Sequence, residues 1–285
     1  MKIYYDCLPC LLRQAIDTVK LVTNNKSVQE KVIKEIMNDM ASFNFNETPP
    51  FMASLIQSKI KKMLNIDDPY KEIKDKFNHS ALKLSADSRK LIDNSSDKLE
   101  TAIRISIAGN IIDFGVYSDL TEEDVKKTIN DCLNRKIIFN KVEELKERID
   151  RAEKILFLGD NAGEIVFDKL LIENLPIEKI TYVVKKEPAL NDSTMFDAAQ
   201  IGMNKLVKVI DNGSNVPGTD LKQCSAEFLI EYEKSDLIIS KGQGNYETLS
   251  DDKNKEIFFL LKAKCPVIAD NLGCKVGDIV LKRNR

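Results

Sequence analysis

Apolar residues in the first half of the chain recur with the period of an α-helix. The rhythm is clear over residues 11–19, 28–40, 52–64 and 91–112. It is broken at Thr48 to Pro50 and again at Asp67 to Pro69, and the last run ends at Gly115. Thr121 to Asp124 has the spacing of an acidic capping box, which predicts the start of another helix. A further helix is expected over 139–149. Residues 1–150 are therefore predicted to form a mainly helical N-terminal part.

From residue 151 onward, short apolar runs alternate with segments of helix length. The runs expected to be strands are 154–158, 180–184, 206–210, 237–239 and 266–269, with a possible edge strand over 278–281. The segments expected to be helices are 164–174, 193–201, 221–234 and 252–264. Strands that alternate with helices predict a parallel sheet covered on both faces. The fold class expected is α/β, in which 151–285 form a Rossmann-like three-layer α/β/α domain with a mainly parallel sheet.

Composition excludes several broad classes of protein. The chain has 285 residues, 43% hydrophobic and 31% charged, which is typical of a globular protein. Lys and Arg number 43 against 45 Asp and Glu, so no basic excess favours nucleic acid as a partner. No apolar run approaches the roughly 20 residues that span a bilayer, and the N-terminus has no apolar signal core. We expect a cytoplasmic protein without a membrane partner, and the sequence leaves its oligomeric state open.

Histidine and cysteine usage limits the metal chemistry available. The chain has a single histidine, His79, which excludes histidine-cluster zinc sites. His79 lies in a polar stretch, which disfavours a Ser-His-Asp triad. Six cysteines in a chain without a secretion signal are expected to be reduced. Cys7 and Cys10 form a CxxC, a spacing that suits a metal or a redox pair. Two ordinary thiols on an N-terminal segment are an equally good interpretation of this motif.

Polar loops follow each expected strand of the second half. In an open parallel sheet, ligands bind beyond the carboxyl ends of the strands, so these loops locate the site. They comprise residues 159–164, 185–194, 211–214, 241–245 and 270–271. Carboxylates, carboxamides, glycines and a lysine converge there, a mixture that suits a hard cation together with an anionic ligand.

Two of these loops carry candidate metal ligands. Asp160 and Asn161 offer adjacent oxygen ligands, and Asp192 in the next loop can complete a three-point hold on a divalent cation. The alternative is that these side chains only cap the helices that begin near Gly163 and Ser193.

The loop from Lys241 to Asn245, with sequence KGQGN, combines glycines with a lysine. Its glycines allow backbone N–H groups to face an anion and Lys241 supplies a point charge, although glycine at such a turn often serves geometry alone. Rival motifs are absent from the sequence: there is no P-loop, no G-x-G-x-x-G after the first strand and no G-x-S-x-G. A nicotinamide dehydrogenase or an adenosylmethionine-dependent methyltransferase is therefore disfavoured.

Taken together, four motifs resemble those of the damage-control phosphatase family, formerly a domain of unknown function. They are GDNAGE at 159–164, NDST at 191–194, KGQGN at 241–245 and AGNIIDFG at 108–115. The CxxC at Cys7 and Cys10 resembles the prokaryotic, largely archaeal, subgroup of that family. The resemblance extends in order over nearly the whole chain.

The resemblance implies a metal-dependent phosphatase and assigns roles to particular residues. The implied metal ligands are Asp160, Asn161 and Asp192. The implied substrate-binding residues are Lys241 at the phosphate, with Gly242 and Asn245 in its turn, then Glu164, Asn110 and Asp113. Asn110 and Asp113 are expected to reach over the cleft from the helical part, unless Asp113 and Gly115 simply end a helix.

We therefore expect hydrolysis of small phosphomonoesters, such as sugar phosphates, damaged phosphometabolites or nucleotide side products. Asp160, Asp192 and Lys241 are the expected catalytic residues, with Mg²⁺, Mn²⁺, Co²⁺ or Ni²⁺ as cofactor and either water or a carboxylate as nucleophile. The rival hypothesis is a non-catalytic metal- or nucleotide-binding module whose CxxC senses redox state or metal. The rival makes Cys7 and Cys10 essential, whereas a phosphatase with a distant CxxC can dispense with them.

Overall fold

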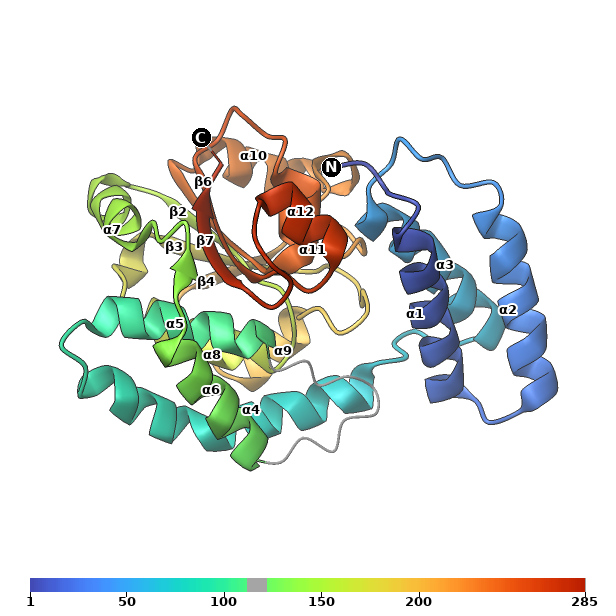
Figure 1. Cartoon of the computed structure of the whole chain (residues 1–285), viewed down its shortest axis with the longest axis horizontal. Helices are drawn as coiled ribbons and strands as arrows, with labels where there is room; N and C mark the ends of the chain where they lie inside the picture. The colour runs from blue at the N-terminus through green and yellow to red at the C-terminus, as the bar shows by residue number, and fades with distance from the viewer. Residues whose placement is uncertain (112–121, 285) are drawn as a thin grey trace.

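The computed structural model describes residues 1–111 and 122–284 (Figure 1). Its α-helices are α1 (Cys7–Val22), α2 (Lys26–Met40), α3 (Pro49–Leu64), α4 (Lys71–Asp93), α5 (Lys98–Ile111), α6 (Glu122–Asn134), α7 (Val142–Arg151), α8 (Glu164–Ile172), α9 (Met195–Gln200), α10 (Ala226–Lys234), α11 (Gly242–Leu249) and α12 (Pro266–Leu272). Its strands are β1 (Ile137–Ile138), β2 (Ile155–Leu158), β3 (Ile180–Val184), β4 (Lys208–Asp211), β5 (Leu237–Lys241), β6 (Ile257–Lys262) and β7 (Ile279–Arg283).

The strands form one sheet in the order β1-β7-β6-β5-β2-β3-β4. Strands β2 to β6 run parallel, and β7 pairs antiparallel with β6. In register, Phe157 of β2 lies beside Tyr182 of β3 on one side and Ile239 of β5 on the other. Because β2 comes first of these strands in the chain and sits between β3 and β5, the strand order reverses there. The crevice at the carboxyl ends of β2 and β5 is therefore the topological switch point, where ligands bind in such folds.

Helices cover both faces of the sheet, because alternate residues of each strand point to opposite sides. Phe157 and Tyr182 belong to one core cluster, which includes apolar residues of α4 to α9. Leu158 and Val183 belong to a second cluster with α10, α11 and α12. In Figure 1, α11 and α12 lie on one side of the strands, and α5 and α8 lie on the other. The three-layer α/β/α fold expected from the sequence is thus confirmed.

Helices α1, α2 and α3 form a separate bundle beside the α/β layers (Figure 1). Ala15 and Val19 of α1 pack there against Ile36 of α2 and Ile60 of α3 in a third core cluster. Pro50 follows Pro49 in the first turn of α3, and Thr48 caps that turn through a hydrogen bond from Phe51 N. This bundle supplies one wall of the cavity described below.

The strand–helix alternation starts near residue 151, as the pattern predicts. Residues on both sides of this position nevertheless share one hydrophobic core. Ile103 and Ala108 of α5 share a cluster with Ile165 of α8. Ile137 in β1 joins the sheet by pairing with Ile279 of β7. The helical first half therefore divides in packing between the α1–α3 bundle and a layer on the sheet.

Two predicted elements near the C-terminus are wrong. The helix expected over 252–264 is strand β6, and the strand expected over 266–269 is helix α12. The unbroken apolar run of Ile257 to Leu261 is typical of a strand buried on both faces. Pro266 occupies the first turn of α12 and Gly273 ends it in the left-handed conformation, a Pro-start, Gly-end pattern typical of helices.

Strand β7 also differs from expectation, because it lies inside the sheet and β1 lies at the edge. Within the described ranges, no helix is both long and apolar enough to span a membrane.

Candidate active site

The loops after β2 and β3 meet beside the switch point and carry Asp160, Asn161 and Asp192. Backbone hydrogen bonds lock them together: Ser193 N donates to Asp160 O at 2.8 Å, and Ala162 N donates to Asn191 O at 2.9 Å. These side chains therefore extend from two neighbouring loops whose backbones are held together by hydrogen bonds.

Capping does not explain these polar side chains. Helix α8 begins after Gly163, which makes no side-chain cap hydrogen bond. Helix α9 is capped by Thr194, whose backbone N–H and hydroxyl both donate to Asp197. Asp160, Asn161 and Asp192 are therefore available for another task.

A hydrogen-bonded layer beneath the cavity orients the Asp160 carboxylate. Asn110 Nδ2, from α5, donates to Asp160 Oδ2 at 3.0 Å and to Glu164 Oε2 at 2.9 Å. Asn161 Nδ2 donates to the same two carboxylates at 2.8 and 3.1 Å. Both amides thus bridge Asp160 and Glu164, which fixes the two acidic groups side by side.

Lys241 lies below this layer and is fully buried. Its Nζ donates to Glu164 Oε1 at 2.6 Å, Asp168 Oδ1 at 2.6 Å and Ser106 O at 3.0 Å. Three acceptors match the three hydrogens of the ammonium group. The arrangement gives Lys241 a role in holding Glu164, and its contact with phosphate remains a prediction from the sequence.

Asp192 carries a buried oxygen, Oδ2, without a hydrogen-bond partner in the described part of the chain. Lys185 Nζ lies 3.6 Å from it and itself donates to Gly218 O. A buried carboxylate oxygen without a hydrogen bond is costly, and a ligand in the cavity would remove that cost.

The acidic groups of the site repel one another electrostatically. Burial raises the pKa of Asp160 well above its ordinary value, and the neighbouring Glu164 and Asp192 carboxylates raise it further. Burial also raises the pKa of Asp192 to about 6, although Lys185 opposes the shift. Burial alone would raise the pKa of Glu164, but the Lys241 ion pair and the Asn110 hydrogen bond outweigh it and hold the pKa below its ordinary value. A cation between Asp160 and Asp192 would relieve this repulsion.

The donor set fits a hard divalent cation. Asp160, Asn161 and Asp192 offer two carboxylates and a carboxamide, the oxygen ligands that Mg²⁺ and Mn²⁺ prefer. Asp192 Oδ2, which accepts no hydrogen bond from the described residues and has only the Lys185 ammonium 3.6 Å away, can serve as a ligand atom for such an ion. Among the described residues, no group of three or more His, Cys, Asp or Glu side chains is arranged to hold a metal, so the carboxamide is needed for a third protein ligand.

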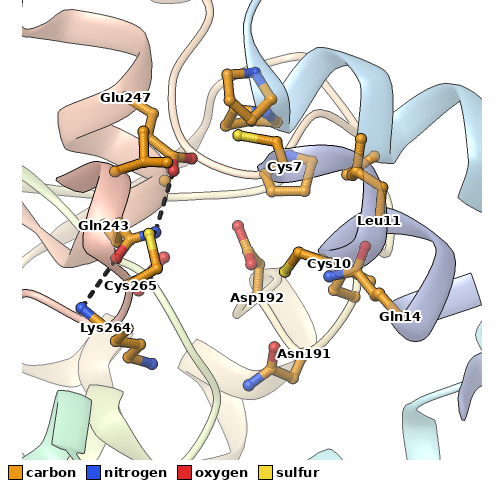
Figure 2. Close-up of a pocket in the computed structure, with 18 of the residues that line it drawn as sticks. Cys7, Cys10, Leu11, Gln14, Asn191, Asp192, Gln243, Glu247, Lys264 and Cys265 are labelled. Carbon is orange, nitrogen blue, oxygen red and sulfur yellow. Dashed lines mark hydrogen bonds between the residues drawn. The ribbon is translucent and has the colours of Figure 1, made fainter. Parts of the chain in front are cut away.

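A cavity of about 450 Å³ opens above these residues, between the α1–α3 bundle and the carboxyl ends of the strands (Figure 2). Its floor includes Asp160, Asn161 and Asp192, and Lys264 lies in its wall just beyond the end of β6. Apolar side chains such as Leu11 and Val267 line other parts. The cavity therefore has an acidic floor, a lysine and apolar surface, which suit a small phosphorylated molecule.

The CxxC motif lines this same cavity (Figure 2). Cys7 and Cys10 come from the first turn of α1, and Cys265 comes from the opposite wall at the N-cap of α12. The expectation of a CxxC distant from the site is therefore wrong, because α1 folds back over the ends of the strands.

Sequence and structure comparisons agree on one family. The model of the damage-control phosphatase ARMT1-like domain matches residues 3–280. The chain is 38% identical to a damage-control phosphatase of Pyrococcus horikoshii, with 100% of this chain and 99% of that protein covered. It is 33% identical to a damage-control phosphatase of Archaeoglobus fulgidus, with 99% of each covered. The chain belongs to the damage-control phosphatase family.

A further relative and the crystal structure of the Pyrococcus horikoshii protein agree with this membership over the full length of the chain. An uncharacterized protein of Methanocaldococcus jannaschii is 40% identical, with 99% of this chain and 96% of that protein covered. A crystal structure of a DUF89 family protein from Pyrococcus horikoshii superposes with a TM-score of 0.93 at 36% identity, and each chain is fully covered. The resemblance stated from the motifs is thereby confirmed.

The remaining residues implied by the family resemblance lie under the cavity or outside the described part. Asn245 is buried, donating to Gly159 O and Lys241 O and accepting from Thr219. Gly242 packs directly against the Asp160 carboxylate. Asp113 lies outside the described residues. The KGQGN motif therefore supports the Asp160 loop from below, except for Gln243 and Gly244, which line the cavity.

Three functional candidates in this family member escaped sequence reasoning. The sequence pattern predicts a helix over Lys264, whereas the structure places Lys264 just beyond the end of strand β6. Lys185 follows the second predicted strand, which was a usable signal. Asp168 stands four residues after Glu164 on α8, a spacing that puts both carboxylates on one helix face toward Lys241.

Proposed function

We propose that this protein is a divalent-metal-dependent phosphomonoesterase that acts on small phosphorylated metabolites, including sugar phosphates and damaged phosphometabolites. The observation that carries the proposal is the meeting of Asp160, Asn161 and Asp192 beside the switch point, on the floor of a cavity of about 450 Å³ that Lys264 also lines. Membership of a family whose named members are damage-control phosphatases supports the same reaction class.

In this proposal, Asp160, Asn161 and Asp192 hold the cation. When bound, the cation supplies charge neutralisation at the phosphoryl group and lowers the pKa of a coordinated water. Lys264 adds a second positive charge from the cavity wall. Asn110 fixes the Asp160 carboxylate from below through its 3.0 Å hydrogen bond.

Replacement of Cys7 and Cys10 does not distinguish a non-catalytic binding module from a phosphatase. Because Cys7 and Cys10 line the cavity, their replacement would alter either a binding module or an enzyme. Turnover itself is therefore the discriminating measurement.

The experiment is phosphate release from an aryl phosphate and a panel of sugar phosphates. Metal-stripped protein is assayed with Mg²⁺, Mn²⁺, Co²⁺ or Ni²⁺ added back. We expect turnover restored by metal in the wild type and lost in Asp160→Ala, because that variant removes a ligand at the centre of the site. Asp270→Ala is the matched control, since Asp270 is exposed on α12 and does not line the cavity. Absence of turnover with every metal in folded wild-type protein would contradict the proposal.

Lys264→Met tests the phosphate-binding lysine. A charge-assisted hydrogen bond contributes roughly 1.5–3 kcal/mol, so the inhibition constant of inorganic phosphate should rise about 10- to 100-fold. Lys275→Met is the control, because Lys275 is exposed and lies outside the cavity. Equal phosphate affinity in the two variants would remove Lys264 from the site.

A further inference from the structure

The thiols of the CxxC motif stand in the wall of the substrate cavity, yet the phosphatase reaction assigns them no task. Cys7 is the first residue of α1 and Cys10 lies one turn later, and both line the cavity that holds Asp160. Figure 2 shows them on the α1 side, with Cys265 across the cavity beside Gln243. All three are free thiols.

The helix places Cys7 and Cys10 at disulfide distance. Residues three apart in a helix lie on one face, and their Cα atoms are separated by about 5 Å. Disulfides join Cα atoms about 4.4–6.8 Å apart, so the bond can close within one helical turn. Metal binding by the thiol cluster is a poorer interpretation, because the described residues contain no metal-binding group of three or more His, Cys, Asp or Glu side chains.

We propose that Cys7 and Cys10 form a dithiol site that low-molecular-weight disulfides oxidise reversibly to an intrahelical disulfide, which changes how the cavity binds the organic part of its substrate. The site is assigned by the position of the pair in the cavity wall and by the spacing within α1.

The difference in exposure between the two thiols indicates the order in which they react with the disulfide. Cys10 is exposed and Cys7 is half-buried, so Cys10 meets the oxidant first. The Cys10 thiolate attacks one sulfur of RSSR, the S–S bond breaks, and one RSH leaves after taking up a proton. The Cys7 thiolate then attacks Sγ of Cys10 in the mixed disulfide and releases a second RSH. The protein loses two electrons and two protons, and RSSR is reduced to two RSH.

The first experiment follows the bond itself and needs no turnover. The full-length protein is incubated with glutathione disulfide at mildly alkaline pH, because burial raises the pKa of both thiols. We expect the intact mass to fall by about 2 Da, peptide mapping to join Cys7 to Cys10, and dithiothreitol to restore the mass. A bond from either residue to Cys265, or no loss of mass, would overturn the proposal.

Single-cysteine variants test the order of attack. Cys7→Ser should trap glutathione on Cys10, and Cys10→Ser should add glutathione several-fold more slowly, because the remaining thiol is half-buried. Cys274→Ser is the matched control: Cys274 does not line the cavity, so that variant should form the disulfide at the wild-type rate. Equal trapping rates in the first two variants would contradict the order.

The second experiment measures the effect on the cavity, and this part rests on the proposed phosphatase function. Oxidised and reduced wild type are compared with an aryl phosphate as substrate and inorganic phosphate as inhibitor. We expect KM for the ester to change at least about threefold, with kcat and phosphate inhibition changed less than about twofold, because the thiols lie on the α1 side of the cavity, across from Lys264. Unchanged KM in fully oxidised enzyme overturns the cavity effect. Inactivity of the reduced enzyme would contradict the phosphatase proposal. The intact-mass measurement would still show whether the disulfide forms.

Discussion

At the scale of single residues, the candidate site depends on buried charges that hold one another in place. The Asp168 and Glu164 carboxylates share the Lys241 ammonium at 2.6 Å each, and Tyr182 OH and Ser106 Oγ donate to Asp168. A buried ion pair stabilises a fold little, but removal of one partner leaves an uncompensated charge. Lys241 is therefore a positioning residue for Glu164.

We predict that Lys241→Met lowers the free energy of unfolding by about 3–5 kcal/mol, because two buried carboxylates lose their cation. Urea denaturation monitored by circular dichroism measures the change. Lys34→Met serves as the control, since Lys34 pairs with Glu30 on an exposed helix face and its loss should leave the free energy of unfolding nearly unchanged. Similar decreases in the free energy of unfolding in both variants would show that the buried Lys241 ion pairs contribute no more than an exposed pair.

At the scale of elements, the turn between β5 and α11 fixes the position of the loop that carries Asp160. Gly242 begins α11 with φ +77° and approaches the Asp160 side chain so closely that a methyl group would overlap the carboxylate. The glycine is needed here for its backbone conformation and for its missing side chain together. The turn that resembles a phosphate cradle in sequence thus acts as a close-packed support for Asp160.

We predict that Gly242→Ala abolishes phosphatase activity, because the new methyl group displaces the Asp160 carboxylate. Gly273→Ala is a matched control: Gly273 ends α12 with φ +73°, but a methyl group there meets no atom within 4 Å. Both variants should lose roughly 1–2 kcal/mol of stability from backbone strain. Only the first should lose turnover, as measured by phosphate release under metal saturation. Full activity of folded Gly242→Ala would contradict the assigned support.

At the scale of the whole molecule, the sheet and its site were predictable where each strand is followed by a distinct polar loop. The loops at Asp160 and Asp192 could be placed together from the sequence, because parallel strands end at one edge. Periodicity alone could not show that β6 is a strand and α12 a helix, since a short apolar run fits either a buried strand or a buried helix. Because β6 was expected to be a helix, the sequence did not indicate that Lys264 follows a strand and lines the cavity.

The position of the CxxC was beyond sequence reasoning for a different reason. Local pattern predicts helix α1 but not where the α1–α3 bundle docks, because docking depends on contacts between residues far apart in the chain. In the structure, Lys61 Nζ of α3 donates to Pro188 O at 3.4 Å, in the loop after β3. Met1 N donates to Glu247 O of α11 at 2.6 Å. These contacts bring Cys7 and Cys10 to the cavity, which therefore belongs to the assembled molecule and not to either half.

If the bundle forms one wall of the substrate site, a larger side chain on that wall should select against larger substrates. Ala53 of α3 lines the cavity, and Ala53→Leu adds three carbon atoms to a space of about 450 Å³. We expect kcat/KM to fall at least about tenfold for an aryl phosphate and less than about threefold for a three-carbon sugar phosphate, because overlap grows with the organic group. Ala41→Leu, at an exposed position after α2, should leave both values unchanged. Thermal unfolding establishes that each variant is folded. A uniform loss across esters would indicate a distorted phosphate end, and no loss would place the organic group away from α3.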